Sequence, residues 1–194
     1  MIFTKKELKD FIAADAMANG RTSVKSKLFG DEIWKFQVTL RKLEFYTNQK
    51  GISKKLTFPM RMFHKLRYHR QSLKLGFSIP VNAFDKGLSI AHYGTIVVAT
   101  SAKIGRNCRI HEGVTIGATN GSNQAAIIGN NVFIASGAKI IGEVTIADDV
   151  AIAANAVVTK SICEKGTTWG GVPAKKISDH NSHSNLNKAL FQDI

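Results

Sequence analysis

The chain has 194 residues, the length of one domain with room for a sizeable core. Lys and Arg number 27 against 14 Asp and Glu, and 44% of residues are hydrophobic, so the composition is globular rather than disordered. No apolar run approaches the ~20 residues of a membrane-spanning helix, and residues 1–20 lack the apolar block of a secretory signal. Two cysteines, Cys108 and Cys163, exclude a disulfide framework and fit a reducing compartment. These features predict a cytoplasmic protein.

The excess positive charge lies in the first part of the chain. Residues 1–76 hold 17 basic and 6 acidic side chains, a net charge of +11, whereas residues 77–194 hold 10 and 8, a net charge of +2. Such a change in composition marks a domain boundary. We therefore predict a basic helical region over 1–76, a body over 77–178 and a polar C-terminal tail over 179–194.

Two segments of the basic region have the apolar spacing of helices. Residues 31–46 and 53–70 place large apolar side chains among charged ones. Asp31 and Ser53 are expected to cap the two helices, and Pro59 to kink the second. The cationic side chains then form either a solvated face or a surface for an anionic membrane or polymer.

Aliphatic residues recur every six positions from residue 98 onward. They are Val98, Ile104, Ile110 and Ile116, then, after a gap, Ile128, Ile134, Ile140, Ile146, Ile152 and Val158. In an α-helix successive members would lie about 240° apart and face every direction, whereas in strands an even period keeps them on one side. Asn, Gly and Asp between them suit tight corners. The pattern predicts a solenoid of short parallel strands, with coils of ~18 residues around one core over 78–172.

This repeat resembles that of the hexapeptide-repeat acyltransferases. The resemblance implies a mainly β fold, the left-handed parallel β-helix, which usually assembles as a homotrimer. The handedness is implied by the family alone, since ordinary crossover connections are right-handed.

The repeat is interrupted twice. Two extra residues lie between Ile90 and Val98, and the polar stretch 117–124 follows Ile116 as a loop. Because Val98 and Ile116 are one coil apart, we expect both interruptions at the same edge of the solenoid.

The first interruption places three titratable residues together. A shift of one coil plus two residues brings His92 level with Glu112, and His111 lies beside it. A histidine, an acid and a glycine-rich loop at one irregular edge predict an acid–base site. Asp85 and Glu112 are both candidates for the acid that orients His92.

Within the superfamily the chain is most similar to serine O-acetyltransferases. The similarity lies in LSIAHYGTIVV, IGRNCRIHEGVTIG and the closing GGVPAKKI, and it covers about residues 76–178. It implies that His92 is the general base, which removes the proton from an acceptor hydroxyl that attacks acetyl-CoA directly. It also implies backbone oxyanion donors at Gly117, Ala118 and Thr119, and CoA contacts at Ser136, Ala154 and Lys175.

The chain also departs from serine acetyltransferases. Ala91 stands where that family has an acid, and Phe77 or Ser78 stands where it has a second acid that orients the histidine. The loop ends in Gln124-Ala125-Ala126 and lacks the Arg-His pair that holds the serine carboxylate. These departures favour the branch that acetylates sugar hydroxyls in surface-polysaccharide synthesis, with the basic helices near the inner membrane face.

Two alternatives remain open. The chain could acetylate serine for cysteine synthesis, with His111, Arg109 or Arg106 holding the carboxylate. It could also be a non-enzymatic solenoid whose basic region binds anionic surfaces; no aromatic-rich motif accompanies the basic residues, so nucleic acid is not expected.

No metal is expected. His180 and His183 have metal-like spacing but lie in the polar tail without an acid or cysteine cluster, which favours a flexible tail. Cys108 falls on an inward position and is expected in the core, and Cys163 closes the last hexad and is expected to be structural as well.

Overall fold

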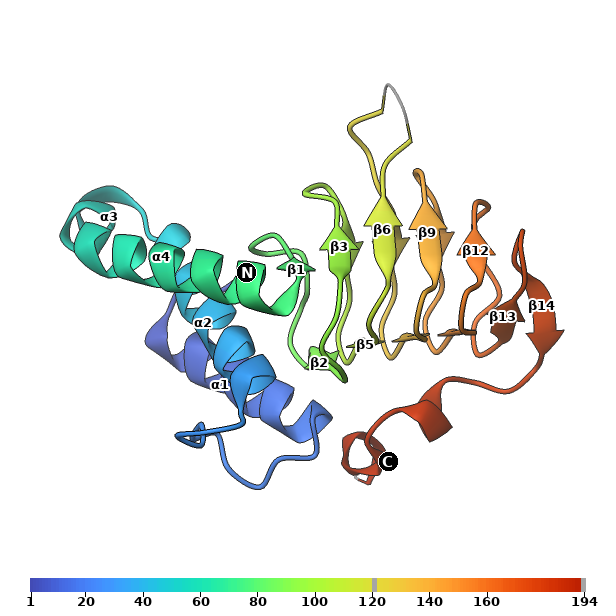
Figure 1. The fold of residues 1–194 in the computed structure, drawn as a ribbon, viewed down its shortest axis with the longest axis horizontal. Coiled ribbons are helices and arrows are strands. Elements are labelled where there is room, and N and C mark those ends of the chain that lie inside the picture. The colour runs from blue at the N-terminus through green and yellow to red at the C-terminus, as the bar shows by residue number, and fades with distance from the viewer. Residues whose placement is uncertain (120–121, 193–194) are drawn as a thin grey trace.

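The computed structural model describes residues 1–119 and 122–192 and places a helical region beside a β-solenoid (Figure 1). The helices are α1 (Lys5–Ala18), α2 (Glu32–Thr47), α3 (Gly51–Leu56) and α4 (Phe58–Leu75), and the short 3-10 helices are η1 (His183–Asn185) and η2 (Lys188–Phe191). The strands are β1 (Phe77–Ser78), β2 (Ser89–Ile90), β3 (Ile96–Val98), β4 (Lys103–Ile104), β5 (Arg109–Ile110), β6 (Thr115–Gly117), β7 (Ile127–Ile128), β8 (Phe133–Ile134), β9 (Lys139–Ile141), β10 (Thr145–Ile146), β11 (Ala151–Ile152), β12 (Val157–Val158), β13 (Thr168–Gly170) and β14 (Lys175–Ser178).

The strands form three sheets, which are the faces of a prism. The five-stranded face has the order β1-β3-β6-β9-β12, the three-stranded face β10-β7-β4, and the six-stranded face β14-β13-β11-β8-β5-β2. Neighbouring strands are parallel, apart from the antiparallel pair β13 and β14. The chain passes from the six-stranded to the five-stranded and then to the three-stranded face in every coil. The predicted mainly β solenoid is confirmed.

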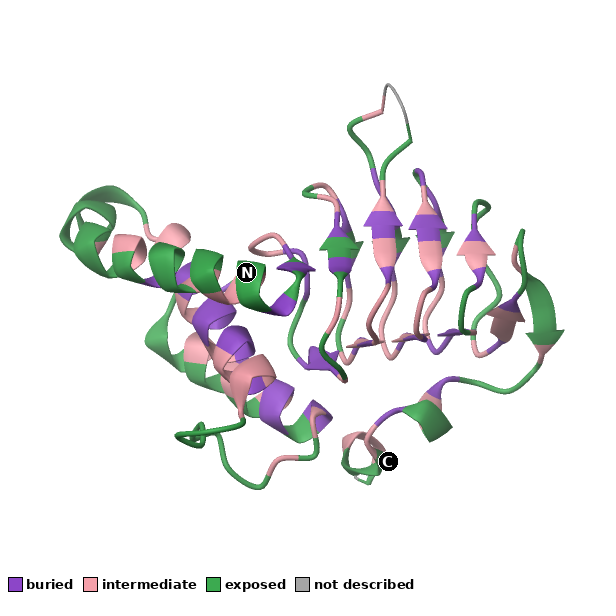
Figure 2. Ribbon diagram, in the orientation of Figure 1, coloured by how far each residue is buried: buried purple, intermediate pink, exposed green. Residues whose placement is uncertain are grey.

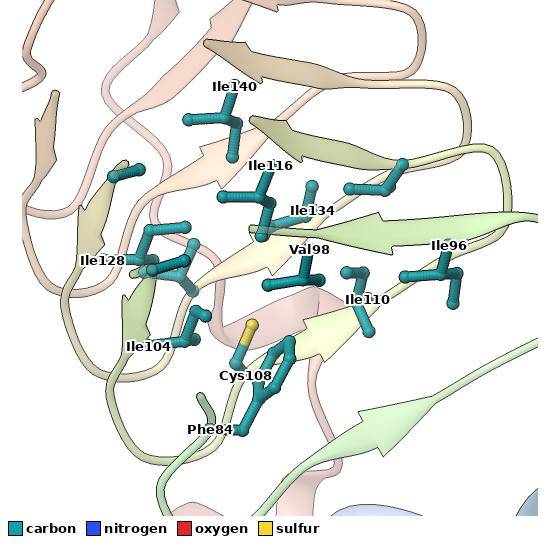
Figure 3. Packing of buried hydrophobic residues seen from close by; sticks show 14 of the residues in the cluster. Phe84, Ile96, Val98, Ile104, Cys108, Ile110, Ile116, Ile128, Ile134 and Ile140 are labelled. Carbon is teal, nitrogen blue, oxygen red and sulfur yellow. The ribbon is translucent and has the colours of Figure 1, made fainter. Parts of the chain in front are cut away.

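One stack of inward aliphatic side chains fills the prism (Figure 3). Ile110 lies opposite Ile134 in the six-stranded face, and Ile116 lies opposite Ile140 in the five-stranded face. All four are 0% exposed. Burying each such side chain contributes about 1.5–3 kcal/mol, so stacking between coils stabilises strands that are only two or three residues long.

The two cysteines have different environments. Cys108 points into the core, as predicted, and burial raises the pKa of its thiol to about 12. Cys163 is exposed, so the expected structural position is wrong. The inward position of that last hexad is taken by the buried Ile162, and the next residue therefore faces outward.

The coil lengths confirm both interruptions but correct their relation. Ile90 pairs with Ile110, 20 positions on, which is two more than the regular coil of 18. Ile104 pairs with Ile128, 24 positions on, so the second interruption adds six residues. The first lies between β2 and β3 and the second between β6 and β7. The expectation that both lie at one edge is wrong, because the strands of the five-stranded face separate the two edges.

The helical region confirms the helix predicted over 31–46, which is α2. Asp31 precedes this helix but makes no capping bond; its carboxylate instead accepts two hydrogen bonds of 2.8 Å from Arg21. Pro59 does not kink one long helix, because α3 ends before Thr57 and Pro59 stands in the first turn of α4. Proline is tolerated there, since its missing N–H would have no partner within the helix.

Helix α1 has no counterpart among the helices predicted from the sequence. It begins with a capping box in which Thr4 and Glu7 exchange side-chain and backbone hydrogen bonds. Figure 2 shows that α2 is largely buried, whereas α3 and α4 are largely exposed. Among the residues described, no helix has the length and hydropathy that a membrane crossing requires.

A buried ionic network joins the helices to the first coil. Arg41 of α2 is 0% exposed and donates to the carboxylate of Asp15 at 2.7 and 3.1 Å and to that of Glu44 at 2.9 Å. Backbone groups of the first coil complete the network: the carbonyls of Phe84 and Asp85, which accept from Arg41, and the N–H groups of Gly87 and Leu88, which donate to Asp15. Removing one partner would leave a buried charge uncompensated.

The tail packs against the protein instead of remaining a flexible extension. Ser182 is buried, and its N–H donates to the carbonyl of Asp149 at 3.0 Å. Further on, Leu186 is buried, and the Asn187 amide donates to the carbonyl of Met17 at 2.6 Å. The tail therefore connects the later coils to α1 (Figure 1).

The ionic network predicts a large effect of one substitution. Arg41→Met leaves two buried carboxylates without their cation, so the free energy of unfolding should fall by about 3–5 kcal/mol in urea denaturation. The control is Lys176→Met, because Lys176 forms exposed pairs with Glu164 and Asp179 whose loss should cost less than about 1 kcal/mol. Equal, small losses in both variants would contradict the role given to Arg41.

Candidate active site

One edge of the prism carries both predicted active-site histidines. At this edge the chain leaves the six-stranded face through β2, β5, β8 and β11 and enters the five-stranded face through β3, β6, β9 and β12. Residues 91–95, 111–114, 135–138 and 153–156 therefore lie on successive coils, and we call this the histidine edge. Backbone hydrogen bonds from Gly137 to Glu112 (2.8 Å) and from Asn155 to Ser136 (2.9 Å) connect consecutive coils there.

His92, His111 and Glu112 form a cluster on the first two coils of the histidine edge. One ring nitrogen from each histidine and one carboxylate oxygen of Glu112 all lie within 4.8 Å of one another. The two imidazole centroids are 5.2 Å apart, with the rings at 81°. His92 is exposed, and the other two side chains are half-buried. The structure thus brings together all three residues that the sequence predicts for acid–base chemistry.

Gly94 allows Glu112 to come close to His92. It has φ +132°, and a Cβ built there would lie 2.9 Å from the Cβ of Glu112. Oε2 of Glu112 is buried and has no hydrogen-bond partner among the described residues, so it is available to accept an N–H from an imidazole. The other candidate acid, Asp85, binds the N–H of Lys86 at 2.8 Å in the connection before β2. Glu112 is therefore the acid that can orient His92.

His111 is contacted on several sides. Its ring meets Phe133 edge-on with centroids 5.1 Å apart, Arg109 Nε lies 3.4 Å from Nε2, and Ser136 Oγ lies 3.4 Å from Nδ1. Partial burial lowers the pKa of His111, and the charges of Arg109 and of the other imidazole lower it further, whereas Glu112 raises it. His111 is therefore neutral near neutral pH.

Ser136, Ala154 and Lys175 continue the line of the cluster. Ser136 is half-buried. Its hydroxyl lowers the pKa of Glu112 more than any other group does, so the Glu112 carboxylate stays ionised. Ala154 is exposed on the next coil, and the exposed Lys175 begins β14 beyond the last coil. The three residues predicted to contact CoA thus follow His111 in order along the solenoid.

The predicted oxyanion donors lie elsewhere: Gly117, Ala118 and Thr119. Gly117 is the last residue of β6 and the other two follow it, whereas the cluster precedes the start of β3 and β6 (Figure 1). Residues 120–121 of the same predicted loop lie outside the described residues. Within one copy of the chain, the expectation that Gly117, Ala118 and Thr119 lie beside His92 is therefore wrong.

Arg109 is the cation next to the cluster. It lies on β5 with its side chain half-buried against His111, and it forms no ion pair with an acid in the described part of the chain. Arg106, another predicted carboxylate partner, lies at the corner between β4 and β5 and is exposed. Of the two arginines, only Arg109 lies at the cluster.

A cavity of about 210 Å³ lies between the helical region and the first coil. Its lining includes Ala91 and Tyr93, the neighbours of His92 in the sequence. The cavity also contains Arg21, whose guanidinium is neutralised by the two hydrogen bonds to Asp31. It therefore offers polar groups for hydroxyls but no free guanidinium for a carboxylate.

The cluster residues also have the chemistry of divalent-cation ligands, since imidazole nitrogens and a carboxylate oxygen converge there. The tail histidines do not converge in this way. Nε2 of His183 lies 2.9 Å from Oδ1 of Asp149 and its ring stacks on Phe191, whereas His180 is exposed. The expectation of a flexible tail around His183 is thus wrong, because its ring is held by the stack on Phe191 and by the contact with Asp149.

Comparisons with known proteins agree with this architecture. The family model "Bacterial transferase hexapeptide (six repeats)" matches residues 125–160. The serine acetyltransferase of Staphylococcus epidermidis is 35% identical over 124 residues, which cover 59% of this chain and 58% of that protein. The serine acetyltransferase of Helicobacter pylori is 37% identical over 101 residues, which cover 51% of this chain and 58% of that protein. The chain contains hexapeptide repeats and is similar to serine acetyltransferases. It spans less than two thirds of the length of these curated relatives.

Solved structures share the fold. Serine acetyltransferase from Brucella abortus superposes with a TM-score of 0.69 at 25% identity, over 92% of this chain and 72% of that one. The same enzyme in complex with coenzyme A gives a TM-score of 0.68 at 25% identity, over 91% and 70%. Neisseria gonorrhoeae serine acetyltransferase in complex with serine gives 0.63 at 22% identity, over 90% and 70%. The predicted left-handed parallel β-helix and the resemblance to this family are confirmed.

The charges around His111 predict how it titrates. NMR titration of its ring signals should give a pKa below the ordinary 6.5. Arg109→Gln removes a neighbouring positive charge and should raise the pKa of His111, whereas Glu112→Gln should lower it further. Because the folded chain binds this proton less tightly than the unfolded chain, stability contributed at this site should fall on acidification. A pKa above 6.5, or shifts of opposite sign in the variants, would contradict this arrangement.

Proposed function

We propose that the chain is an acetyl-CoA-dependent O-acetyltransferase in which His92 is the general base. The observation that carries the proposal is the cluster of His92, His111 and Glu112 on the histidine edge of a hexapeptide-repeat solenoid. The similarity to serine acetyltransferases supports it, because it covers more than half of this chain. A non-enzymatic solenoid would leave the convergence of these three residues without a purpose.

The mechanism is a direct transfer. His92 accepts the proton of the acceptor hydroxyl while the hydroxyl oxygen attacks the thioester carbonyl of acetyl-CoA. The tetrahedral intermediate then expels the CoA thiolate, which takes the proton from the imidazolium. Glu112 accepts an N–H from His92, which fixes the ring orientation and stabilises its charged form. His111 stays neutral and fills the space between Arg109 and the base.

The co-substrate is proposed to lie along the histidine edge. Small side chains on consecutive coils, Ser136 and Ala154, leave room for the pantetheine arm, and Lys175 offers a cation for its phosphates. Gly117, Ala118 and Thr119 remain predicted oxyanion donors. Within a single copy of the chain they lie away from His92. The homotrimer and the cytoplasmic location also stay predictions.

L-serine is the acceptor that the comparisons support better. The relatives described above are serine acetyltransferases, and the Neisseria enzyme was solved with serine. Arg109 supplies a cation without an acidic partner among the described residues, in place of the missing Arg-His pair of the loop. A guanidinium suits a carboxylate because it can bind both oxygens.

A sugar hydroxyl in surface-polysaccharide synthesis is the second candidate. The chain's own departures favour it, since the loop ends in Gln124-Ala125-Ala126 and the cavity beside Tyr93 contains an arginine already neutralised by Asp31. A neutral polyhydroxyl acceptor would need no free cation there.

The base is tested by His92→Ala. Loss of a general base should lower kcat about 10²- to 10⁴-fold with whichever acceptor the unmodified chain uses, L-serine or a sugar from a panel. Released CoA should be measured by chromatography, because the exposed thiol of Cys163 would react with thiol reagents. His180→Ala, which changes an exposed tail histidine, should leave the rate unchanged. Undiminished transfer in His92→Ala would disprove the assignment, and absence of transfer by the unmodified chain with every acceptor would disprove the proposed activity.

The two acceptors are separated by Arg109→Gln. A hydrogen-bonded charge contributes about 1.5–3 kcal/mol, so the KM for L-serine should rise about 10- to 150-fold with a smaller change in kcat. Rates should be compared near pH ~8, well above the lowered pKa of His111, so that the effect of the lost charge on His111 is small. Arg106→Gln is the control. An acceptor without a carboxylate should show almost no change in KM, and the same result with L-serine would exclude Arg109 as its partner.

A further inference from the structure

We propose that helices α3 and α4 form a docking surface for an anionic phospholipid membrane. This surface, which we call the outer helix face, lies away from the histidine edge, and the proposal does not depend on acetyl transfer.

The charge of this segment is entirely positive. Residues 50–75 contain eight Lys and Arg and no Asp or Glu. Within the described residues, the only ion pair made by these cations is that of Lys74 with Glu32, at 3.7 Å, and Lys74 remains 66% exposed. The segment therefore presents an uncompensated positive potential to its surroundings.

Helix α4 has two apolar faces on opposite sides. The inner face is buried through His64 and Leu75 and packs on α2 and the first coil. The outer face carries Phe63, Leu66 and Leu73, which are 55%, 58% and 73% exposed. At about 100° per residue, these three side chains fall within one stripe opposite His64 and Leu75. A solvated helix needs only the inner face, so packing within the fold does not account for a second apolar stripe that is more than half exposed.

Helix α3 extends the apolar surface. Ile52 and Leu56 lie four residues apart on one side of α3 and are 77% and 76% exposed. Phe58, at the start of α4, is 50% exposed. Figure 2 shows α3 and the outward side of α4 as mostly exposed. Several large apolar side chains thus gather at the end of the molecule farthest from the last coil (Figure 1).

Cations border the apolar stripe of α4 on both sides. On the helical wheel, Lys65 and His69 fall on one side of Leu66, Arg67 and Lys74 fall on the other, and Arg70 lies within the stripe. An apolar face bordered by Lys and Arg is the pattern of a helix that lies in the interface of an anionic membrane. The long cationic side chains reach the headgroups while the apolar stripe enters the acyl boundary.

The charge also argues against other occupants. Pairing this segment with the same segment of a second copy would bring eight cations against eight more, and only Lys74 has an acidic partner among the described residues. A nucleic acid or other polyanion would use the cations but would leave Ile52, Leu56 and Leu73 in water. A phospholipid surface satisfies both the charge and the apolar area.

Vesicle flotation of the full chain tests the proposal. We expect binding to phosphatidylcholine vesicles that contain about one third phosphatidylglycerol, weak binding to pure phosphatidylcholine, and loss of binding as salt rises. Equal binding to both vesicle types would contradict the role of charge. Binding to heparin without binding to the anionic vesicles would contradict the lipid and favour a polymer.

Two sets of variants separate the apolar and charged contributions. Phe63→Ser/Leu66→Ser keeps every charge and should lower the partition coefficient at least about tenfold, since both side chains would otherwise enter the acyl boundary. Lys65→Gln/Arg67→Gln should lower it about fivefold per residue. The matched control, Val172→Ser/Ile177→Ser, changes side chains that are 72% and 61% exposed beyond the last coil and should bind as the unmodified chain does.

Light scattering of the same variants without vesicles tests whether a second copy of the chain covers the outer helix face instead. Because Phe63 and Leu66 are exposed, we expect an unchanged mass and melting temperature in Phe63→Ser/Leu66→Ser. A drop in oligomeric mass in this variant would show that a second copy covers the outer helix face and would overturn the proposal. Acetyl transfer in solution should be the same in all these variants, so failure of membrane binding and failure of the enzyme proposal are distinguishable.

Discussion

The register between parallel coils determines which residues of the solenoid become neighbours. Each coil hydrogen-bonds to the next through short backbone segments, so a residue's neighbour is set by the number of residues in one turn. Around the cluster, the N–H of Ala91 donates to Ile110 at 3.2 Å and that of Gly113 donates to Thr95 at 2.7 Å. These two bonds hold the two-residue insertion over the coil that follows it. The proximity of His92 to Glu112 is thus a property of coil length, and the inward aliphatic stack stabilises that length.

The helical region divides into an anchored half and an outward half. Helices α1 and α2 are fixed to the first coil by the Arg41 network and by amide groups of Asn19 and Gln37, which donate to the carbonyl of Leu88. They hold the coil that carries His92 and enclose the cavity beside it. Helix α4 contributes one buried face and α3 has no buried residue, and the remaining surface of both helices is apolar and cationic. The anchored half therefore positions the coil that carries His92. The outward half carries the surface that we propose binds a membrane.

The sequence predicts what depends on local counting. The period of six identifies the inward residues, and the two-residue insertion places His92 level with Glu112, because strand alternation is a short-range rule. The edge of the second interruption was misplaced because the first interruption precedes Val98 whereas the second follows Ile116, so the face that holds both residues lies between them. The burial of Arg41 and Asp15 was also hidden, because charged residues are usually exposed and these two are 26 positions apart. Cys163 was expected in a structural position, but the last inward position belongs to Ile162, one residue earlier.

Acetyl-CoA and the acceptor are proposed to meet at the histidine edge. A crystal structure of the chain with coenzyme A bound tests this proposal most directly. We expect the CoA sulfur beside the His92 imidazole, the pantetheine arm along Ser136 and Ala154, and the phosphates near Lys175. Coenzyme A bound with its sulfur away from His92, or on a different edge of the prism, would contradict the account.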